Sequence, residues 1–188
     1  MYKRQFRPGT QSVPFFAGPR LLNRPHSISA KVGIPEGGAE GVLMAQGTSA
    51  GGFSFYVQDG RLHYVHNWVG RERFEVASSD PVPSGDHVLR FEFEPQGEPD
   101  LAQGHGMPGR FELYVDDQLV GASEVPFTTP FAFNPGALTC GADPGSTVTT
   151  GYAPPFRFTG TLHKVTVDLS GELIQDKESE LRVAMARQ

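Results

Sequence analysis

Residues 52–67 have the sequence GFSFYVQDGRLHYVHN, in which the dipeptide Asp59-Gly60 separates two segments of seven residues each. Both segments are rich in aromatic and β-branched residues, which favour strands. Asp59-Gly60 is a strong signal for a β hairpin, because both residues accept the positive φ angles of a two-residue type I′ turn. The stretch therefore predicts two antiparallel strands, residues 52–58 and 61–67, joined by a tight turn.

Alternation of apolar and polar residues continues on both sides of this hairpin, most clearly in residues 87–94. We expect further strands at residues 26–34, 41–47, 71–77, 87–94, 111–115, 118–123, 138–141 and 156–169. About ten short strands at close spacing are typical of two packed antiparallel sheets, so the pattern predicts an all-β, two-sheet antiparallel sandwich. One core is expected to contain Phe91, Phe93, Phe111, Leu113, Val115, Val165 and Val167.

The composition supports this fold class and excludes several functions. The 188 residues include 23 Gly, 16 Pro and 14 Phe, a profile that disfavours a helical bundle. The net charge is −5 with no basic block, so we expect no nucleic-acid partner. No apolar run approaches the roughly 18 residues of a membrane span, and we expect no membrane partner. A single cysteine, Cys140, excludes an internal disulfide framework, while the compartment stays undecided.

The domain organisation follows from where the strand pattern begins and ends. Residues 1–5, MYKRQ, resemble the translation of a sequencing adapter, so we set them aside as a segment of external origin. Residues 6–25 contain four prolines and no sustained period, which is typical of an arm or linker. The β-sandwich domain is expected at residues 26–170. Residues 171–188 form a tail with helical character in part.

The histidines and the cysteine give no catalytic or metal centre. His63 and His66 are three residues apart on one strand, so they point to opposite faces and cannot share a metal ion without a bulge. His26, His87 and His163 fall on the apolar faces of their strands, where structural roles are expected. Cys140 is expected to be a small buried hydrophobic residue rather than a nucleophile.

Two groups of acidic residues on turns leave a choice between a rim Ca²⁺ and a solvated loop. Glu94, Glu98 and Asp100 surround Gly97, and Asp143 opens another turn. Their spacing matches no defined calcium loop, so we predict no metal site and no cofactor in this chain.

Aromatic residues near the hairpin are the candidates for binding a sugar or aryl ring. Tyr64 shares a strand face with Leu62, which also allows a role in the core. Trp68 follows the strand directly and is the better surface candidate. We therefore name Tyr64 and Trp68 as candidate ligand-binding residues, with a glycan as the possible partner.

Several stretches together resemble the C-terminal β domain of long bacterial arylsulfatases. The matching segments run in order along nearly all of the chain from about residue 20: NRPHSI (23–28), IPEGGAEGV (34–42), GGFSFYV (51–57), DGRLHYV (59–65), LRFEFE (89–94), GEPD (97–100), LYVD (113–116), FTGTL (158–162), VDLSG (167–171) and RVAMARQ (182–188).

This resemblance implies a concanavalin-A-like jelly roll attached to a sulfatase catalytic domain, which would be its partner in the same chain. In that family a formylglycine nucleophile acts beside a Ca²⁺ ion, and the formylglycine is made from a Cys or Ser in a C/S-x-P/A-x-R motif. Cys140 is followed by Gly141-Ala142-Asp143-Pro144, with no arginine at the required place. No catalytic residue of the family can therefore be carried onto this chain.

Three hypotheses follow from the sequence. The chain is a non-catalytic accessory domain of an arylsulfatase that packs on the catalytic domain, with Phe15-Phe16 and residues 173–185 as the expected interface. Alternatively, it is an autonomous carbohydrate-binding jelly-roll module. A third possibility is a small glycan-cleaving enzyme, which would need two convergent carboxylates.

Overall fold

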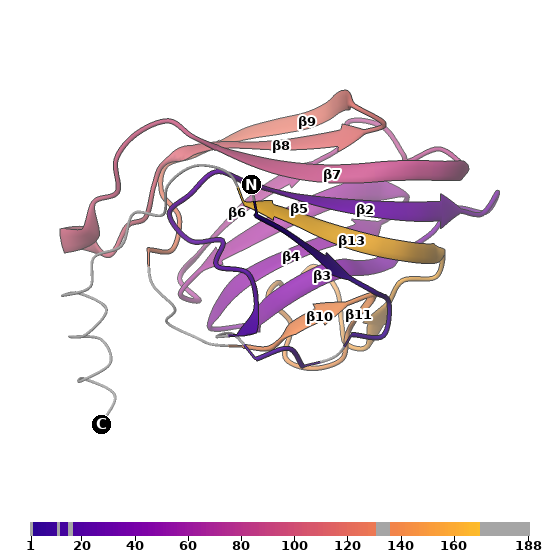
Figure 1. The fold of residues 1–188 in the computed structure, drawn as a ribbon, viewed down its shortest axis with the longest axis horizontal. Helices are drawn as coiled ribbons and strands as arrows, with labels where there is room; N and C mark the ends of the chain where they lie inside the picture. Colours follow the sequence, from indigo (N-terminus) through magenta and orange to yellow (C-terminus); the bar gives the residue numbers. More distant parts are fainter. Residues whose placement is uncertain (1, 11, 15–16, 131–135, 170–188) are drawn as a thin grey trace.

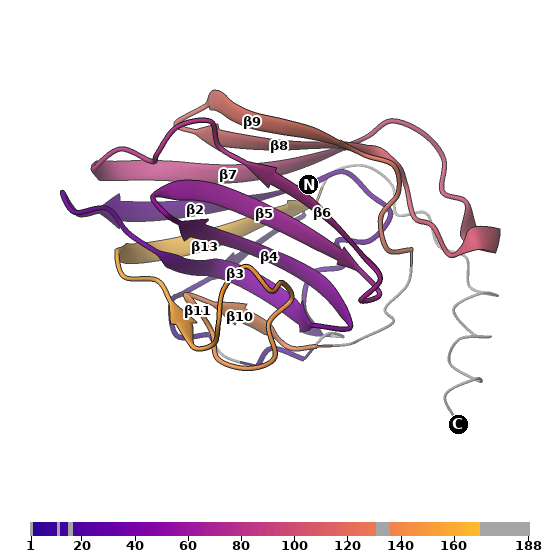
Figure 2. The same ribbon diagram turned by 180° about the vertical axis from the view of Figure 1, so that it is seen from behind.

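The chain folds into two β sheets packed face to face (Figures 1 and 2). The computed structural model describes residues 2–10, 12–14, 17–130 and 136–169. Figure 1 looks onto a six-stranded sheet, and Figure 2 looks from behind onto a seven-stranded sheet. The all-β, two-sheet sandwich predicted from the sequence is thus confirmed. Across the described ranges, no helix is long and apolar enough to cross a membrane.

The six-stranded sheet is antiparallel throughout and has the order β1-β13-β2-β7-β8-β9. Its strands are β1 (Tyr2–Phe6), β2 (His26–Ile34), β7 (Gly85–Pro95), β8 (Gly109–Val115), β9 (Gln118–Val125) and β13 (Thr161–Leu169). β2 lies between β13 and β7, so the strands closest to the centre come from distant parts of the chain.

The seven-stranded sheet has the order β11-β12-β3-β4-β5-β6, and β10 also pairs with β3. Its strands are β3 (Gly41–Thr48), β4 (Gly51–Gln58), β5 (Arg61–Trp68), β6 (Glu72–Ala77), β10 (Leu138–Cys140), β11 (Ala142–Asp143) and β12 (Phe156–Arg157). β12 runs parallel to β3, so this sheet is mixed. A short 3₁₀ turn, η2 (Leu101–Gln103), lies in the connection between β7 and β8.

The hairpin predicted at residues 52–67 forms in the structure. β4 and β5 pair in antiparallel register from Gly52↔Asn67 to Gln58↔Arg61. Asp59 and Gly60 have φ angles of 51° and 73°, the positive values that a type I′ turn requires.

The core between the sheets contains the aromatic residues that the alternation predicts. Phe91 and Leu113 are fully buried, and Phe93 and Phe111 are nearly so. Val165 and Val167 are fully buried, while Val115 packs against the same cluster partly buried. The Phe91 ring of one sheet stacks on the Tyr64 ring of the other, with centroids 3.5 Å apart. The predicted register of β7, β8 and β13 is therefore confirmed.

The outer faces of the two sheets differ in how they are covered. On the seven-stranded sheet, a second apolar cluster forms where the segment between β11 and β12 folds back over β3, β4 and β5 (Figure 2). Its members are Val42, Ala45, Tyr56, Val65 and Tyr152, with Phe156 packed against them. On the six-stranded sheet, β2, β7 and β13 alternate buried residues with partly or fully exposed ones. The outer face of the six-stranded sheet therefore presents side chains to solvent along β2, β7 and β13.

The structure differs from the sequence-based expectations in its strands. One sheet is mixed rather than antiparallel, and the strand expected at residues 156–169 is divided into β12 and β13. Residues 2–5 of the segment that we set aside, together with Phe6 of the expected arm, form β1 and pair with β13 from Tyr2↔Leu169 to Phe6↔Val165. Whether residues 1–5 derive from an adapter stays a prediction. His163 does not face the core, because a register shift between Leu162 and Lys164 inserts an extra residue into β13. Its side chain is 46% exposed. The Phe15-Phe16 pair and residues 171–188, for which partial helical character was expected, lie outside the described residues.

Candidate functional site

Tyr64 and Trp68 lie on the same face of β5 but in different surroundings. Tyr64 is 2% exposed and stacked on Phe91 in the core. Burial raises the pKa of its hydroxyl well above the usual value. Because its ring is enclosed by core residues, Tyr64 does not line a surface site.

Trp68 is the last residue of β5 and lies half-buried at the rim of the sandwich. Its indole Nε1 donates a hydrogen bond of 3.1 Å to the carbonyl oxygen of Gly104. Edge-to-face contacts join its ring to His105 and Phe127, at centroid distances of 5.2 and 5.1 Å. This aromatic group holds the β7–β8 connection against β5, and ligand binding by Trp68 stays a prediction.

The remaining candidates have structural surroundings. His63 stacks on Tyr56 at 5.0 Å on the outer side of β5, whereas His66 faces Phe111 in the core, as a period of two predicts. Cys140 is 1% exposed, and burial raises the pKa of its thiol to about 12. The neutral thiol is a poor nucleophile, in agreement with the structural role expected for it.

The acidic residues do not converge on a cation. Asp100 accepts a hydrogen bond from the backbone N–H of Gln103 and caps η2. Asp143 is buried and accepts a 2.9 Å hydrogen bond from the hydroxyl of Tyr152. Within the described ranges, no group of three or more His, Cys, Asp or Glu residues could hold a metal ion.

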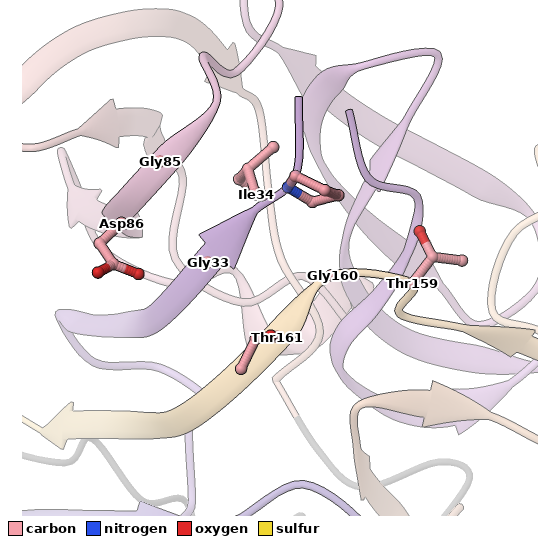
Figure 3. A pocket seen from close by; sticks show the side chains of 8 residues that line it. Gly33, Ile34, Gly85, Asp86, Thr159, Gly160 and Thr161 are labelled. Atoms are coloured by element: carbon pink, nitrogen blue, oxygen red, sulfur yellow. The ribbon is translucent and has the colours of Figure 1, made fainter. Parts of the chain in front are cut away.

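A hollow of about 430 Å³ lies where β2 ends, β7 begins and β13 begins (Figure 3). We call it the Gly33 hollow. It is lined by Gly33, Ile34, Pro35, Gly85, Asp86, Thr159, Gly160 and Thr161. The hollow is open to solvent, and its volume is within the range of about 300–1,000 Å³ usual for small-molecule sites.

The register of β2, β7 and β13 determines which residues lie side by side at the bottom of this hollow. Gly33 of β2 is directly opposite Asp86 of β7 on one side and Thr161 of β13 on the other. Figure 3 shows the Asp86 and Thr161 side chains on either side of Gly33. A Cβ atom on Gly33 would lie 3.2 Å from Asp86 Oδ1 and 3.5 Å from Thr161 Cβ. The missing side chain therefore keeps the space between a carboxylate and a hydroxyl open.

The hydrogen-bonding groups of the Gly33 hollow are available to a ligand to different degrees. The Asp86 side chain is 81% exposed, and its Oδ1 lies 3.9 Å from His163 Nε2. Thr161 is also exposed. The Thr159 hydroxyl accepts a 2.9 Å hydrogen bond from the backbone N–H of Glu40, which fixes its position at the rim. Asp86 and Thr161 are thus the two side chains that can turn toward a ligand.

Sequence reasoning missed this site because its residues are far apart in the chain. One signal was present, since Gly33 occupies the polar face of a strand whose other positions on that face carry side chains. Glycine inside a strand often marks the close approach of a ligand or another backbone. Its neighbours across the sheet could not be identified without the strand order.

No protein-family model matches the chain, and no curated protein matches it. Solved structures do match. The chain is similar to the Ruminococcus gnavus IT-sialidase CBM40 bound to α2,3-sialyllactose, with 13% identity over 87% of this chain and 82% of that one and a TM-score of 0.52. It is also similar to mouse laminin α1 chain domains LG4-5, with 14% identity over 90% of this chain and 42% of that one and a TM-score of 0.53.

These similarities define the class of the protein as a jelly-roll, concanavalin-like β sandwich. At such low identity they establish the fold and not the function. The comparisons lend no support to the arylsulfatase resemblance in the sequence.

Proposed function

We propose that this chain is a carbohydrate-binding module and that the Gly33 hollow receives the sugar. The observation that carries the proposal is the row Asp86–Gly33–Thr161, in which a glycine separates an exposed carboxylate from an exposed hydroxyl. An ionised carboxylate only accepts hydrogen bonds, whereas a threonine hydroxyl both donates and accepts. Neighbouring hydroxyls of a sugar ring offer the same mixture of donors and acceptors.

The lining of the hollow favours binding over hydrolysis. Glycoside hydrolysis usually requires a pair of Asp or Glu residues on either side of the scissile bond. Asp86 is the one carboxylate among the eight residues that line the Gly33 hollow. A structure of the same fold with α2,3-sialyllactose bound supports the proposal at the level of fold, since it is an example of a jelly-roll domain that holds a glycan.

Filling the hollow should weaken glycan binding without unfolding the protein. The variant is Gly33→Val, and its side chain would occupy the space between Asp86 and Thr161. The atom that it would meet is the end of an exposed carboxylate that can move aside, and valine suits a strand. We expect at least about tenfold weaker binding of any ligand identified on a glycan array, corresponding to a loss of about 1.4 kcal/mol. Thermal unfolding should change little.

The matched controls are Ser29→Val, on the same face of β2 but outside the hollow, and Trp68→Ala. Trp68 contacts Gly104 in the connection after β7, whereas Gly85 of the hollow begins that strand, so the two sites are at opposite ends. Loss of binding in Trp68→Ala with normal binding in Gly33→Val would move the site to the Trp68 end. No binder on the array would contradict the proposed function itself.

The accessory domain of an arylsulfatase is the second candidate, and it rests on the sequence resemblance alone. It predicts that the purified chain hydrolyses an aryl sulfate only at the buffer rate in the presence of Ca²⁺, because the sole cysteine is buried and lacks the modification motif. Turnover by the chain would contradict a non-catalytic role. Sequencing the genomic DNA upstream of the Phe6 codon tests the parent enzyme directly, and an in-frame stop there would contradict it.

A further inference from the structure

A row of uncompensated cations lies next to the Gly33 hollow on the outer face of the six-stranded sheet. Lys31 of β2 and Lys164 of β13 are directly opposite each other in the antiparallel register, and both are exposed. Like charges at directly opposed positions destabilise a sheet. No described residue forms an ion pair with either lysine, so the repulsion between them is not relieved within the part of the chain that the structure describes.

These lysines line a second hollow, of about 530 Å³, together with Gln5, Arg7 and His163. Phe6 pairs with Val165 of β13 in antiparallel register. Arg7, the next residue after Phe6, therefore lies beside Lys164, the residue before Val165. The lining thus contains one arginine, two lysines and no carboxylate. The whole chain has a net charge of −5, so this hollow is a local departure from its overall charge.

The cationic hollow adjoins the Gly33 hollow. Lys31 and Gly33 are two residues apart on the same face of β2, a distance of about 6.6 Å along a strand. Asp86 of the first hollow and His163 of the second are joined by the 3.9 Å contact between Oδ1 and Nε2. A linear polymer that lies along β2 and β13 can therefore occupy both hollows.

We infer that the cationic hollow binds an oxyanion, a carboxylate or a sulfate, carried by an acidic polysaccharide whose neighbouring sugar lies in the Gly33 hollow. This inference rests on the proposed function and names its ligand class. Arginine and lysine form their strongest hydrogen bonds with oxyanions, and arginine can do so with two parallel bonds. An oxyanion between Lys31 and Lys164 also replaces the repulsion between these opposed lysines by attraction to both.

The test compares three forms of one polysaccharide: chondroitin sulfate, desulfated chondroitin and carboxyl-reduced desulfated chondroitin. A glycan array with acidic and neutral members is screened in parallel, so that binding to a polysaccharide other than chondroitin is also detected. The variant is Lys31→Gln with Lys164→Gln, which removes both charges and keeps the side-chain length. The control is Lys3→Gln, since Lys3 lies on β1 of the same sheet but pairs with Asp168 at 3.1 Å and lies outside both hollows.

We expect the binders to be acidic and their affinity to fall as ionic strength rises. The double variant should bind them at least about tenfold more weakly, as expected for the loss of charged hydrogen-bond donors. Lys3→Gln should bind as the unaltered chain does. The thermal midpoint of the double variant should stay the same or rise, because the opposed charges are gone. Tighter binding of chondroitin sulfate than of desulfated chondroitin would identify the oxyanion as a sulfate. Equal binding of these two, with loss of binding after carboxyl reduction, would identify it as a carboxylate.

Four outcomes would overturn the inference, and they are distinguishable. If neutral glycans bind as well as acidic ones and the double variant binds both normally, the ligand class is wrong while the proposed function stands. If no glycan binds, the proposed function fails as well. If glycans bind but Gly33→Val binds them normally, the site assigned to that function is wrong. Equal binding of the acidic glycans and of duplex DNA would also overturn it, because the site would then recognise negative charge rather than a polysaccharide.

Discussion

Replacing Phe91 with alanine is expected to lower the free energy of unfolding by about 3–5 kcal/mol, the range for a fully buried phenylalanine. Phe91 is 0% exposed. Its ring stacks on Tyr64 of the opposite sheet at 3.5 Å and meets Phe111 edge-to-face at 5.4 Å. Removing it leaves a cavity between the sheets and breaks an aromatic contact that joins them. Denaturation with urea, fitted by linear extrapolation, measures the loss.

Leu119→Ala is the matched control for this prediction. It also shortens a large apolar side chain, but Leu119 is 51% exposed on β9. Its replacement should change the stability by less than about 1 kcal/mol. A loss below about 1 kcal/mol for Phe91→Ala would contradict the register, because it would mean that this ring faces solvent.

The strand alternation made most of the sandwich predictable from the sequence. A shift of one residue in β7 would bury Arg90 and Glu92 and expose Phe91, so the register had one acceptable solution. The turn at Asp59-Gly60 was predictable for a local reason, since both residues tolerate positive φ. These signals act over two to eight neighbouring residues and need no knowledge of the tertiary structure.

The candidate site was not predictable, because it depends on the order of the strands. Asp86, Gly33 and Thr161 form one row because β2 lies between β7 and β13. The same strand order places Lys164 opposite Lys31. The bulge that turns His163 outward has no sequence signal either, since the apolar period continues through Val165 and Val167. Tyr64 had two possible roles, and only the contact with Phe91 decided between them.

Acidification is expected to destabilise the fold between pH 6.5 and about 4 through two buried histidines. Burial lowers the pKa of His26 and of His66 from 6.5 to about 4. The ring of His66 also accepts a hydrogen bond at Nε2 from the backbone N–H of Thr129, 3.1 Å away, which protonation would break. Below pH 6.5 the unfolded chain binds protons that the folded chain excludes. The free energy that each of these two histidines contributes to folding is therefore fully present above pH 6.5. Below that pH it falls by about 1.4 kcal/mol per pH unit for each histidine, down to about pH 4.

The acid-unfolding midpoint of single variants tests this assignment, together with NMR titration of the imidazole protons. His26→Phe keeps an aromatic ring between Phe91 and Phe93 and removes the titrating group, so its unfolding midpoint should shift to lower pH. His163→Gln removes a half-exposed histidine and should leave the midpoint unchanged. The buried Asp143 acts in the opposite direction: burial raises the pKa of its carboxyl above 3.8, so the folded chain binds this proton at a higher pH than the unfolded chain does, which offsets part of the loss as the pH falls toward 3.8. Titration of His26 and His66 near pH 6.5 in the folded protein would contradict the prediction, since both rings would then be accessible to water.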